Sequence, residues 1–225
     1  MPATHHLSPN IQTNFGPYPY NFNSRLTNTS GNHNNVRFLC LDQSQWNWIQ
    51  TPEITKKIRD CYPNVQDLAL VNPDLTSDSS YCLPLLYAPF KDSPQQLTSL
   101  SVERCVSVVN PKAFLRLICM FPMLNNLCIN NITMENGSSL PQESATGPRF
   151  RGKLTFWNIY EPPGTCTIAP LLHLWVEFSE VCLINCCFDK PQGLNGLFVA
   201  CKGTVKKVQI SKVMIYNLLE HGPFH

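Results

Sequence analysis

The sequence predicts an α/β fold made of stacked repeats, with a parallel sheet of about seven strands. Short apolar–x–apolar stretches begin at Leu100, Leu127, Leu154, Val181 and Val208. Their residue numbers rise by a constant 27, as 127−100, 154−127, 181−154 and 208−181 show. Two copies with slightly longer spacing come earlier, at Leu39 and Leu68. A period of roughly 20 to 50 residues indicates a solenoid, in which each unit buries its apolar side against the next.

The repeated unit reads L-x-x-L-x-L, because most stretches carry a further apolar residue three places before the first anchor. These residues are Val36, Val65, Leu97, Leu124, Phe178 and Val205. Before Leu154 this place is taken by Arg151, and we expect Phe150 beside it to fill the gap. The period falls in the leucine-rich-repeat range, so we expect a leucine-rich-repeat solenoid, or horseshoe, with helices or irregular segments on its convex side.

We expect three parts along the chain: a disordered tail over 1–35, the repeat domain over 36–220 and a short tail over 221–225. The first part is rich in Asn, Ser and Pro. A segment of that composition cannot bury enough apolar surface to offset its ordering entropy.

Four segments between the strands are expected to be apolar helices, and they are 52–61, 111–121, 168–178 and 194–201. Asn110 and Pro111 suit the start of the second helix, and Pro122 ends it. Gly203 is expected to end the fourth as a C-terminal glycine. The segments 73–94 and 133–149 show no helical pattern, and we expect them to be irregular.

The residues between and beside the apolar anchors point away from the core, so we expect them to line one accessible face of the sheet. The central row consists of Cys40, Ala69, Ser101, Cys128, Thr155, Cys182 and Gln209. The trailing row, two residues later, consists of Asp42, Val71, Glu103, Asn130, Trp157, Ile184 and Ser211. The leading row, two residues earlier, consists of Phe38, Asp67, Ser99, Asn126, Lys153, Glu180 and Lys207.

We expect this face to bind a protein partner. Trp157 and Ile184 are large apolar residues placed side by side, and exposed aromatic residues form many interface hot spots. The alternative is that an adjacent loop covers Trp157. Acidic residues near the first repeats and basic residues near the last would orient a partner. The expected contact residues are Asp42, Asp67, Ser101, Glu103, Cys128, Asn130, Lys153, Thr155, Trp157, Cys182, Ile184, Lys207 and Gln209.

Catalytic and cofactor motifs do not occur: the sequence has no G-x-S-x-G, H-E-x-x-H, P-loop or G-x-G-x-x-G. The eleven cysteines include no C-x-x-C pair. Cys182, Cys186 and Cys187 are close enough in sequence to suggest a metal, but strand alternation would divide them between two faces. We therefore expect a non-catalytic protein with no metal and no cofactor.

The formal charge of +2 is too small to predict nucleic-acid binding. The lysines at 202, 206, 207 and 212 are interpreted as a solvated repeat edge rather than a basic binding patch. The sequence contains no stretch long and apolar enough for a membrane helix and no secretory signal pattern. We expect a cytoplasmic or nuclear protein that does not bind membranes.

Three segments share one layout, a helical stretch followed by an apolar strand: ITKKIRDCYPNVQDLAL, FLRLICMFPMLNNLCI and LFVACKGTVKKVQI. Over Val36 to Ile215 the chain resembles the leucine-rich-repeat half of fungal F-box-type proteins. In that family the repeats hold a substrate, while an F-box docks on the adaptor of a cullin–RING ubiquitin ligase.

The resemblance implies the substrate-binding part of such an intracellular receptor, with adaptor binding only if an F-box is present upstream. Residues 1–35 have neither the length nor the Leu-Pro-x-Glu-like opening of an F-box. The alternative is a truncated or orphan repeat protein without a ligase role. A third, weaker hypothesis is an enzyme on an unrecognised scaffold.

Overall fold

The computed structural model describes residues 36–42, 60, 62–76, 96–135, 150–163, 165–173 and 176–216. All of them belong to one compact unit, Gly31–His225. Other expected features lie outside the described residues: the tails at 1–35 and 221–225, most of the helix at 52–61, and most of the irregular segments at 73–94 and 133–149.

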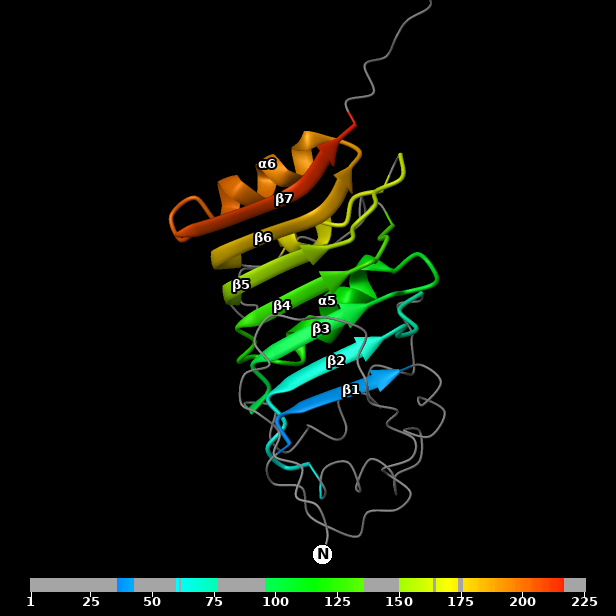
Figure 1. Ribbon diagram of the computed structural model, residues 1–225, viewed down its shortest axis with the longest axis vertical. Helices are drawn as coiled ribbons and strands as arrows, with labels where there is room; N and C mark the ends of the chain where they lie inside the picture. The colour runs from blue at the N-terminus through cyan, green and yellow to red at the C-terminus, as the bar shows by residue number, and fades with distance from the viewer. Residues whose placement is uncertain are drawn as a thin grey trace, which may run out of the picture. The chain divides into compact units, whose positions relative to one another are not determined.

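Within the described residues, seven parallel strands form one sheet in chain order (Figure 1). The strands are β1 Phe38–Asp42, β2 Asp67–Val71, β3 Ser99–Glu103, β4 Asn126–Asn130, β5 Phe150–Trp157, β6 Val176–Phe188 and β7 Lys207–Ile215. Parallel neighbours need crossover connections between them, and helical segments lie between β3 and β4, between β5 and β6 and between β6 and β7. The predicted α/β class and the predicted parallel sheet are confirmed.

The strand register follows the repeat period. Leu100 pairs with Leu127, and the pairing continues through Leu154 and Val181 to Val208. The two copies with longer spacing keep the same register, because Leu39 pairs with Leu68 and Leu68 pairs with Leu100. From β1 to β6 the anchor side chains of these strands are buried. The three rows read from the sequence are therefore true rows of neighbouring residues.

A bulge in β5 explains the irregular copy of the repeat. The register shifts between Gly152 and Lys153, and Gly152 has a φ of 93°. A side chain there would place its Cβ only 2.2 Å from the carbonyl oxygen of Asn125, so glycine is required for space as well as for conformation. The bulge turns Phe150 inward, where it is 2% exposed, and leaves Arg151 outside. The expectation that Phe150 fills the gap is confirmed.

Helix α5, Pro111–Cys119, begins where the sequence predicts. The side-chain oxygen of Asn110 accepts hydrogen bonds from the backbone N–H groups of Lys112 at 2.9 Å and Ala113 at 3.3 Å. Pro111 occupies the first turn, where its missing N–H costs nothing. The buried face of the helix consists of Pro111, Ala113, Phe114, Leu117 and Ile118.

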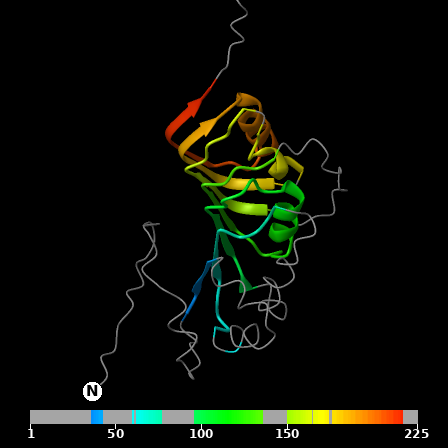
Figure 2. The ribbon, with the colours of Figure 1, turned by 90° about the vertical axis from the view of Figure 1, so that its right-hand side faces the viewer.

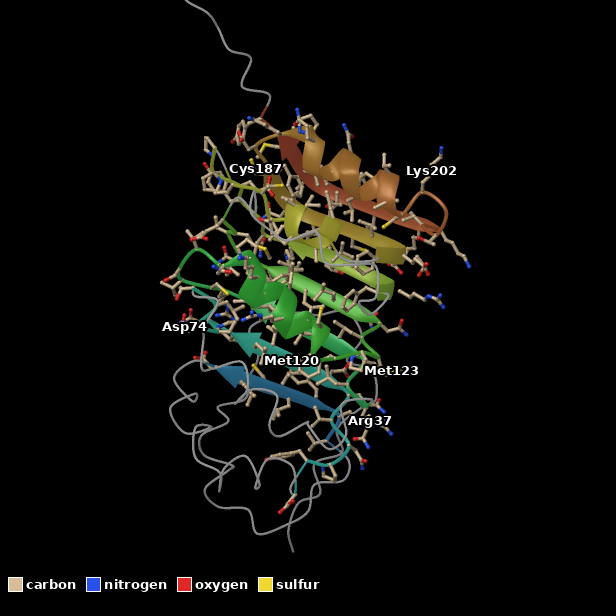
Figure 3. All side chains as sticks on the ribbon, turned by 180° about the vertical axis from the view of Figure 1, so that it is seen from behind. Arg37, Asp74, Met120, Met123, Cys187 and Lys202 are labelled. Atoms are coloured by element: carbon tan, nitrogen blue, oxygen red, sulfur yellow. The ribbon has the colours of Figure 1, made fainter. Side chains whose placement is uncertain are left out.

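Helix α6, Pro191–Ala200, starts three residues earlier than predicted and buries Leu194 and Leu197. A Cβ at Gly196 would lie 2.8 Å from a methyl carbon of Leu172, so glycine allows α6 to approach the preceding segment closely. Both helices lie on the same side of the sheet (Figures 2 and 3), so they cover the face into which the anchor side chains point.

Three local expectations are wrong. The stretch 168–178 is not one helix: it contains a short 3-10 helix, η4 Ala169–His173, and its end belongs to β6 because β6 begins at Val176. Gly203 does not end α6 in a left-handed conformation, since Gly152 is the only glycine with positive φ among the described residues. Finally, Val208 and Ile210 of β7 are exposed rather than buried, because no described strand follows β7 to cover them.

Candidate protein-binding face

The three polar rows lie on the sheet face opposite α5 and α6, because side chains alternate between the faces of a strand. The strand register brings each row together across all seven described strands. Thus Trp157 neighbours Ile184, and Lys153 neighbours Glu180. The sequence therefore predicts the lateral arrangement of the face correctly, and the next question is which side chains a partner can reach.

The central row is mostly hidden, which corrects the expectation that it is solvent-accessible. Its buried members, with their exposed fractions, are Ala69 0%, Ser101 6%, Cys128 9%, Thr155 9% and Cys182 1%. Cys40 is half-buried and Gln209 is exposed. These small side chains are covered by the longer side chains around them.

Cys182 shows how longer side chains cover a residue of the central row. Its sulfur lies 3.5 Å from Oε1 of Glu180 and 3.8 Å from Oε1 of Gln209. Longer side chains on the same strand and on the next strand therefore cover it. Ser101, Cys128, Thr155 and Cys182 were expected to be accessible to a partner, and they are buried instead.

Glu103 is also buried, although it was expected to be an exposed charge. Its Oε1 accepts a hydrogen bond from the Ser101 hydroxyl at 2.7 Å, and its Oε2 accepts one from Nδ2 of Asn130 at 3.4 Å. Hydrogen bonds of this kind are what allow a carboxylate to be buried. Glu103 thus cross-links β3 and β4 on the N-terminal half of the face.

The leading row carries alternating charges at its C-terminal end. Glu180 lies 3.5 Å from Lys153 and 2.9 Å from Lys207, so one carboxylate bridges the lysines of two flanking strands. The hydrogen bond from Lys207 is the main cause that lowers the pKa of Glu180. The expected gradient from acidic to basic repeats is therefore weaker than predicted, because Glu180 was not counted in it.

The cysteines of this face are poor nucleophiles. Burial raises the pKa of the Cys128 thiol to about 12 and that of the Cys40 thiol to about 11. Burial also raises the pKa of Cys182. Because the thiolate is the reactive form, these three thiols stay neutral and unreactive near pH 7.

The accessible residues gather over β4 to β7. Asn126, Lys207, Gln209 and Ser211 are exposed, while Asn130, Lys153, Trp157, Glu180 and Ile184 are partly exposed. On the first three strands Phe38 is exposed, and Cys40, Asp42, Asp67 and Ser99 are partly exposed. Burial raises the pKa of Asp67, against a hydrogen bond from Ser99 and the charge of Arg37. We call the β4–β7 set the accessible face.

A ladder of left-handed residues, which the sequence interpretation missed, follows β2 to β5 and continues at the equivalent places within β6 and β7. Positive φ angles of 51° to 53° occur at Asn72, Arg104, Asn131, Asn158, Asn185 and Lys212. The backbone N–H of each of the first four donates to a carbonyl of the next strand, as Asn158 does to Ile184 at 3.0 Å. Asparagine tolerates this conformation better than most residues do. Asparagines that recur with the period of the repeats, at 131, 158 and 185, were the signal that could have revealed it.

In the part of the chain that the structure describes, no three His, Cys, Asp or Glu side chains gather to hold a metal ion, and Cys182, Cys186 and Cys187 are no exception. None of the described helices is long and apolar enough to cross a membrane.

No protein-family model, curated protein or solved structure matches the chain.

Proposed function

We propose that the chain is a non-catalytic protein-interaction module, a leucine-rich-repeat solenoid that binds a protein partner on its accessible face. The solenoid interpretation is supported by the constant period of the sequence, the sheet in chain order and the left-handed residue that recurs at the equivalent place in successive repeats. Stacked repeats provide extended surfaces of the kind that bind proteins.

The neighbouring pair Trp157 and Ile184 carries the proposal. Both are large apolar residues on adjacent strands, and both remain partly exposed on a polar face. The exposed polar residues Asn126 and Gln209 lie on the same face. An apolar centre with a polar rim is the usual anatomy of a protein interface.

The charged residues of the same face would orient a partner as it docks. Lys153, Glu180 and Lys207 form a row of alternating sign on the same face, separated from the apolar pair by the central row. Ion pairs at an exposed rim contribute little affinity, but they set the register in which a partner docks. We therefore place the affinity in Trp157 and Ile184 and the specificity in the charged row.

The proposal is tested by photo-crosslinking in an extract of the source organism. A photoreactive amino acid replaces Ile184 in one variant and Val199 in a control, since Val199 is 73% exposed on α6 at the opposite face. The Ile184 variant should form a defined adduct that the Val199 variant does not form. Identical adducts from both variants would place the binding surface elsewhere.

A second measurement assigns energy to the anchor. With the partner purified, Trp157→Ala should raise the Kd at least tenfold, since hot-spot truncations cost about 2 kcal/mol or more. Val199→Ala should change the Kd less than twofold, roughly the effect of a surface position outside an interface. Equal Kd values for the wild type and Trp157→Ala would contradict the choice of anchor.

The narrower form of the proposal follows the resemblance to fungal F-box-type proteins. In this form the accessible face holds a substrate of a ubiquitin ligase, and a cullin–RING adaptor binds only through an F-box upstream. Purification of the protein from its source should then recover the adaptor with both the wild type and Trp157→Ala. Only the wild type should also recover a substrate. Recovery of a partner without the adaptor would favour a repeat protein with no ligase role.

A further inference from the structure

β7 is the last strand of the described sheet (Figure 1), and it carries exposed apolar side chains. β7 pairs with β6 on one side, and among the described residues no strand lies on its other side. Val208 and Ile210 are 45% and 61% exposed, whereas their register neighbours Val181 and Leu183 on β6 are buried. An open edge of this kind is a template for pairing with another strand.

The backbone of β7 repeats the groups that join each earlier strand to the next. The carbonyl just before the leading-row residue of a strand accepts an N–H from the segment that leads into the next strand, as Thr98 accepts from Asn125 at 2.7 Å and Ser179 from Lys206 at 2.8 Å. The left-handed residue that follows the trailing-row residue donates its N–H to the following strand, as Asn158 does to Ile184. The equivalent groups of β7 are the carbonyl of Lys206 and the N–H of Lys212. In the described part of the chain no further strand completes these bonds.

Charge indicates what the next strand would carry. In the leading row Lys153, Glu180 and Lys207 alternate on neighbouring strands, so an acidic residue would continue the pattern. The segment 201–216 contains four lysines and no acidic residue. Lys202, Lys206 and Lys212 form no ion pair with the described residues. Lys202 projects from the loop that leads into β7 (Figure 3).

We propose that the open edge of β7 binds an acidic, extended segment of another protein by strand addition. The segment runs parallel to β7 and reads acidic–apolar–x–apolar. Its acidic residue lies beside Lys207, and its two apolar residues pack beside Val208 and Ile210. Its backbone bonds to the Lys206 carbonyl and the Lys212 N–H. Main-chain bonds supply affinity in this binding mode, and alternate side chains supply specificity.

A second copy of the chain fits this edge less well. Two β7 edges placed together would bring like lysine charges into contact, which is unfavourable across a strand pair. The opposite end of the sheet is no better partner: Leu39 and Leu41 of β1 are already buried at 3% and 0% exposure. In addition, β1 would place Phe38 rather than an acidic residue beside Lys207.

The test uses a synthetic peptide that copies residues 178–185, with serine in place of the cysteine. This segment of β6 follows Lys153 of β5 in the register that the proposal requires after Lys207. Fluorescence anisotropy with the full chain should show saturable binding. A matched peptide with lysine in place of the glutamate should bind at least fivefold more weakly, with a difference that shrinks at high salt. No saturable binding up to about 1 mM peptide overturns the proposal.

Variants of the protein locate the binding edge. Lys207→Gln should weaken binding of the acidic peptide about threefold, the usual effect of losing one exposed ion pair. Ile210→Lys should weaken it about tenfold, because it removes an apolar contact of the pair. Ile210 is already exposed, so the fold should survive, and circular dichroism checks this. Val199→Lys on α6 is the control, and an equal loss of binding in that variant overturns the proposal.

Backbone pairing has its own readout. A peptide N-methylated on the amides of the edge that faces β7 should not bind, whereas methylation of the opposite edge should leave the affinity within twofold. Equal binding by the two methylated peptides overturns strand addition. Sedimentation completes the test: if the wild type is a dimer that Ile210→Lys converts to a monomer, the occupant is a second copy and the proposal is wrong. The Ile210→Lys and N-methylation results involve neither Trp157 nor the charged row, so they are independent of the function proposed for the accessible face.

Discussion

Asn185 donates its side-chain Nδ2 to Oδ1 of Asn158 at 2.7 Å, across one full repeat of the sequence. Asn158 donates in turn to Oδ1 of Asn130 at 3.3 Å. Asn158 and Asn185 both have positive φ angles; Asn158 follows the last residue of β5, and Asn185 takes the equivalent place within β6, after Ile184. The amide side chains therefore connect the three successive repeats that contain β4, β5 and β6. This relationship explains why asparagine suits these turns: it accepts the left-handed backbone and bonds to the next repeat with the same side chain.

Asn158→Ala should destabilise the fold by about 1–3 kcal/mol, because it adds left-handed strain and removes hydrogen bonds on both sides. Asn158→Gly is the matched variant, since glycine accepts the backbone conformation but cannot form the side-chain bonds. Urea unfolding should rank the wild type above the glycine variant and the glycine variant above the alanine variant. Equal stability of wild type and Asn158→Ala would contradict the structural role of the ladder.

Gly152→Ala should lower the free energy of unfolding by about 2 kcal/mol or more. The added Cβ meets the Asn125 carbonyl oxygen at 2.2 Å and sits on a residue with a φ of 93°. Gly203→Ala is the control, because nothing lies within 4 Å of a Cβ built there. Its effect in the same urea titration should stay within about 0.5 kcal/mol. Similar losses in the two variants would show that the bulge does not need glycine.

The strand register was predictable because it depends only on local alternation and on a constant period. One face must be buried, so a slip of one residue would expose every anchor, and this fixes the register strongly. Phe150 shows how far the sequence reaches, since its inward position was expected although the bulge that causes it was not. Helix α5 was predictable for a similar reason: its cap, its proline and its apolar spacing all act within one turn.

Which side chains of this sheet face are buried was not predictable, because burial depends on the length of neighbouring side chains, including those on other strands. Cys182 is covered by Glu180 and Gln209. The buried carboxylate of Glu103 accepts hydrogen bonds from Ser101 and Asn130. The helix expected over 168–178 failed because its end was recruited into the long strand β6, where sheet pairing overrides local propensity.

Glu161 should make the stability of the fold depend on pH. Its carboxylate is 3% exposed and accepts the backbone N–H of Thr167 at 2.6 Å. Burial raises its pKa above the ordinary value of 4.5, although backbone N–H groups of Thr167 and Asp189 oppose the shift. Because the folded state holds the proton more tightly, the contribution of Glu161 is largest below pH 4.5 and is lost as pH rises through the folded pKa.

The measurement compares Glu161→Gln with the wild type by urea unfolding between about pH 4 and pH 8. The variant lacks the titrating group, so its stability relative to the wild type should rise with pH. Glu135→Gln, at an exposed position, is the control and should follow the wild type. A Glu161→Gln curve parallel to that of the wild type would show that this carboxyl does not titrate differently on folding.

Cys119 should react first with a thiol reagent among the nine described cysteines. It is the only one of these nine that is exposed, since the others are buried or partly buried. Burial also raises the pKa of Cys105 and Cys128 to about 12, which leaves little thiolate at pH 8. Brief labelling followed by peptide mass spectrometry ranks the labelling rates of the cysteines. Cys119→Ser should remove the fastest labelling reaction among the nine described cysteines. Faster labelling of Cys128 than of Cys119 would contradict the burial of the central row.

The stacking of residues one period apart is the basis of both the accessible face and the open edge, and a single substitution tests it. Gln209 is the register neighbour of Cys182 on the adjacent strand, so Gln209→Cys should form a disulfide with Cys182 under mild oxidation. Ser211→Cys is the control, because its register neighbour is Ile184. Peptide mapping should find the cross-link to Cys182 in the Gln209 variant alone. Its absence there, or an equal yield in the Ser211 variant, would contradict the register on which the whole account depends.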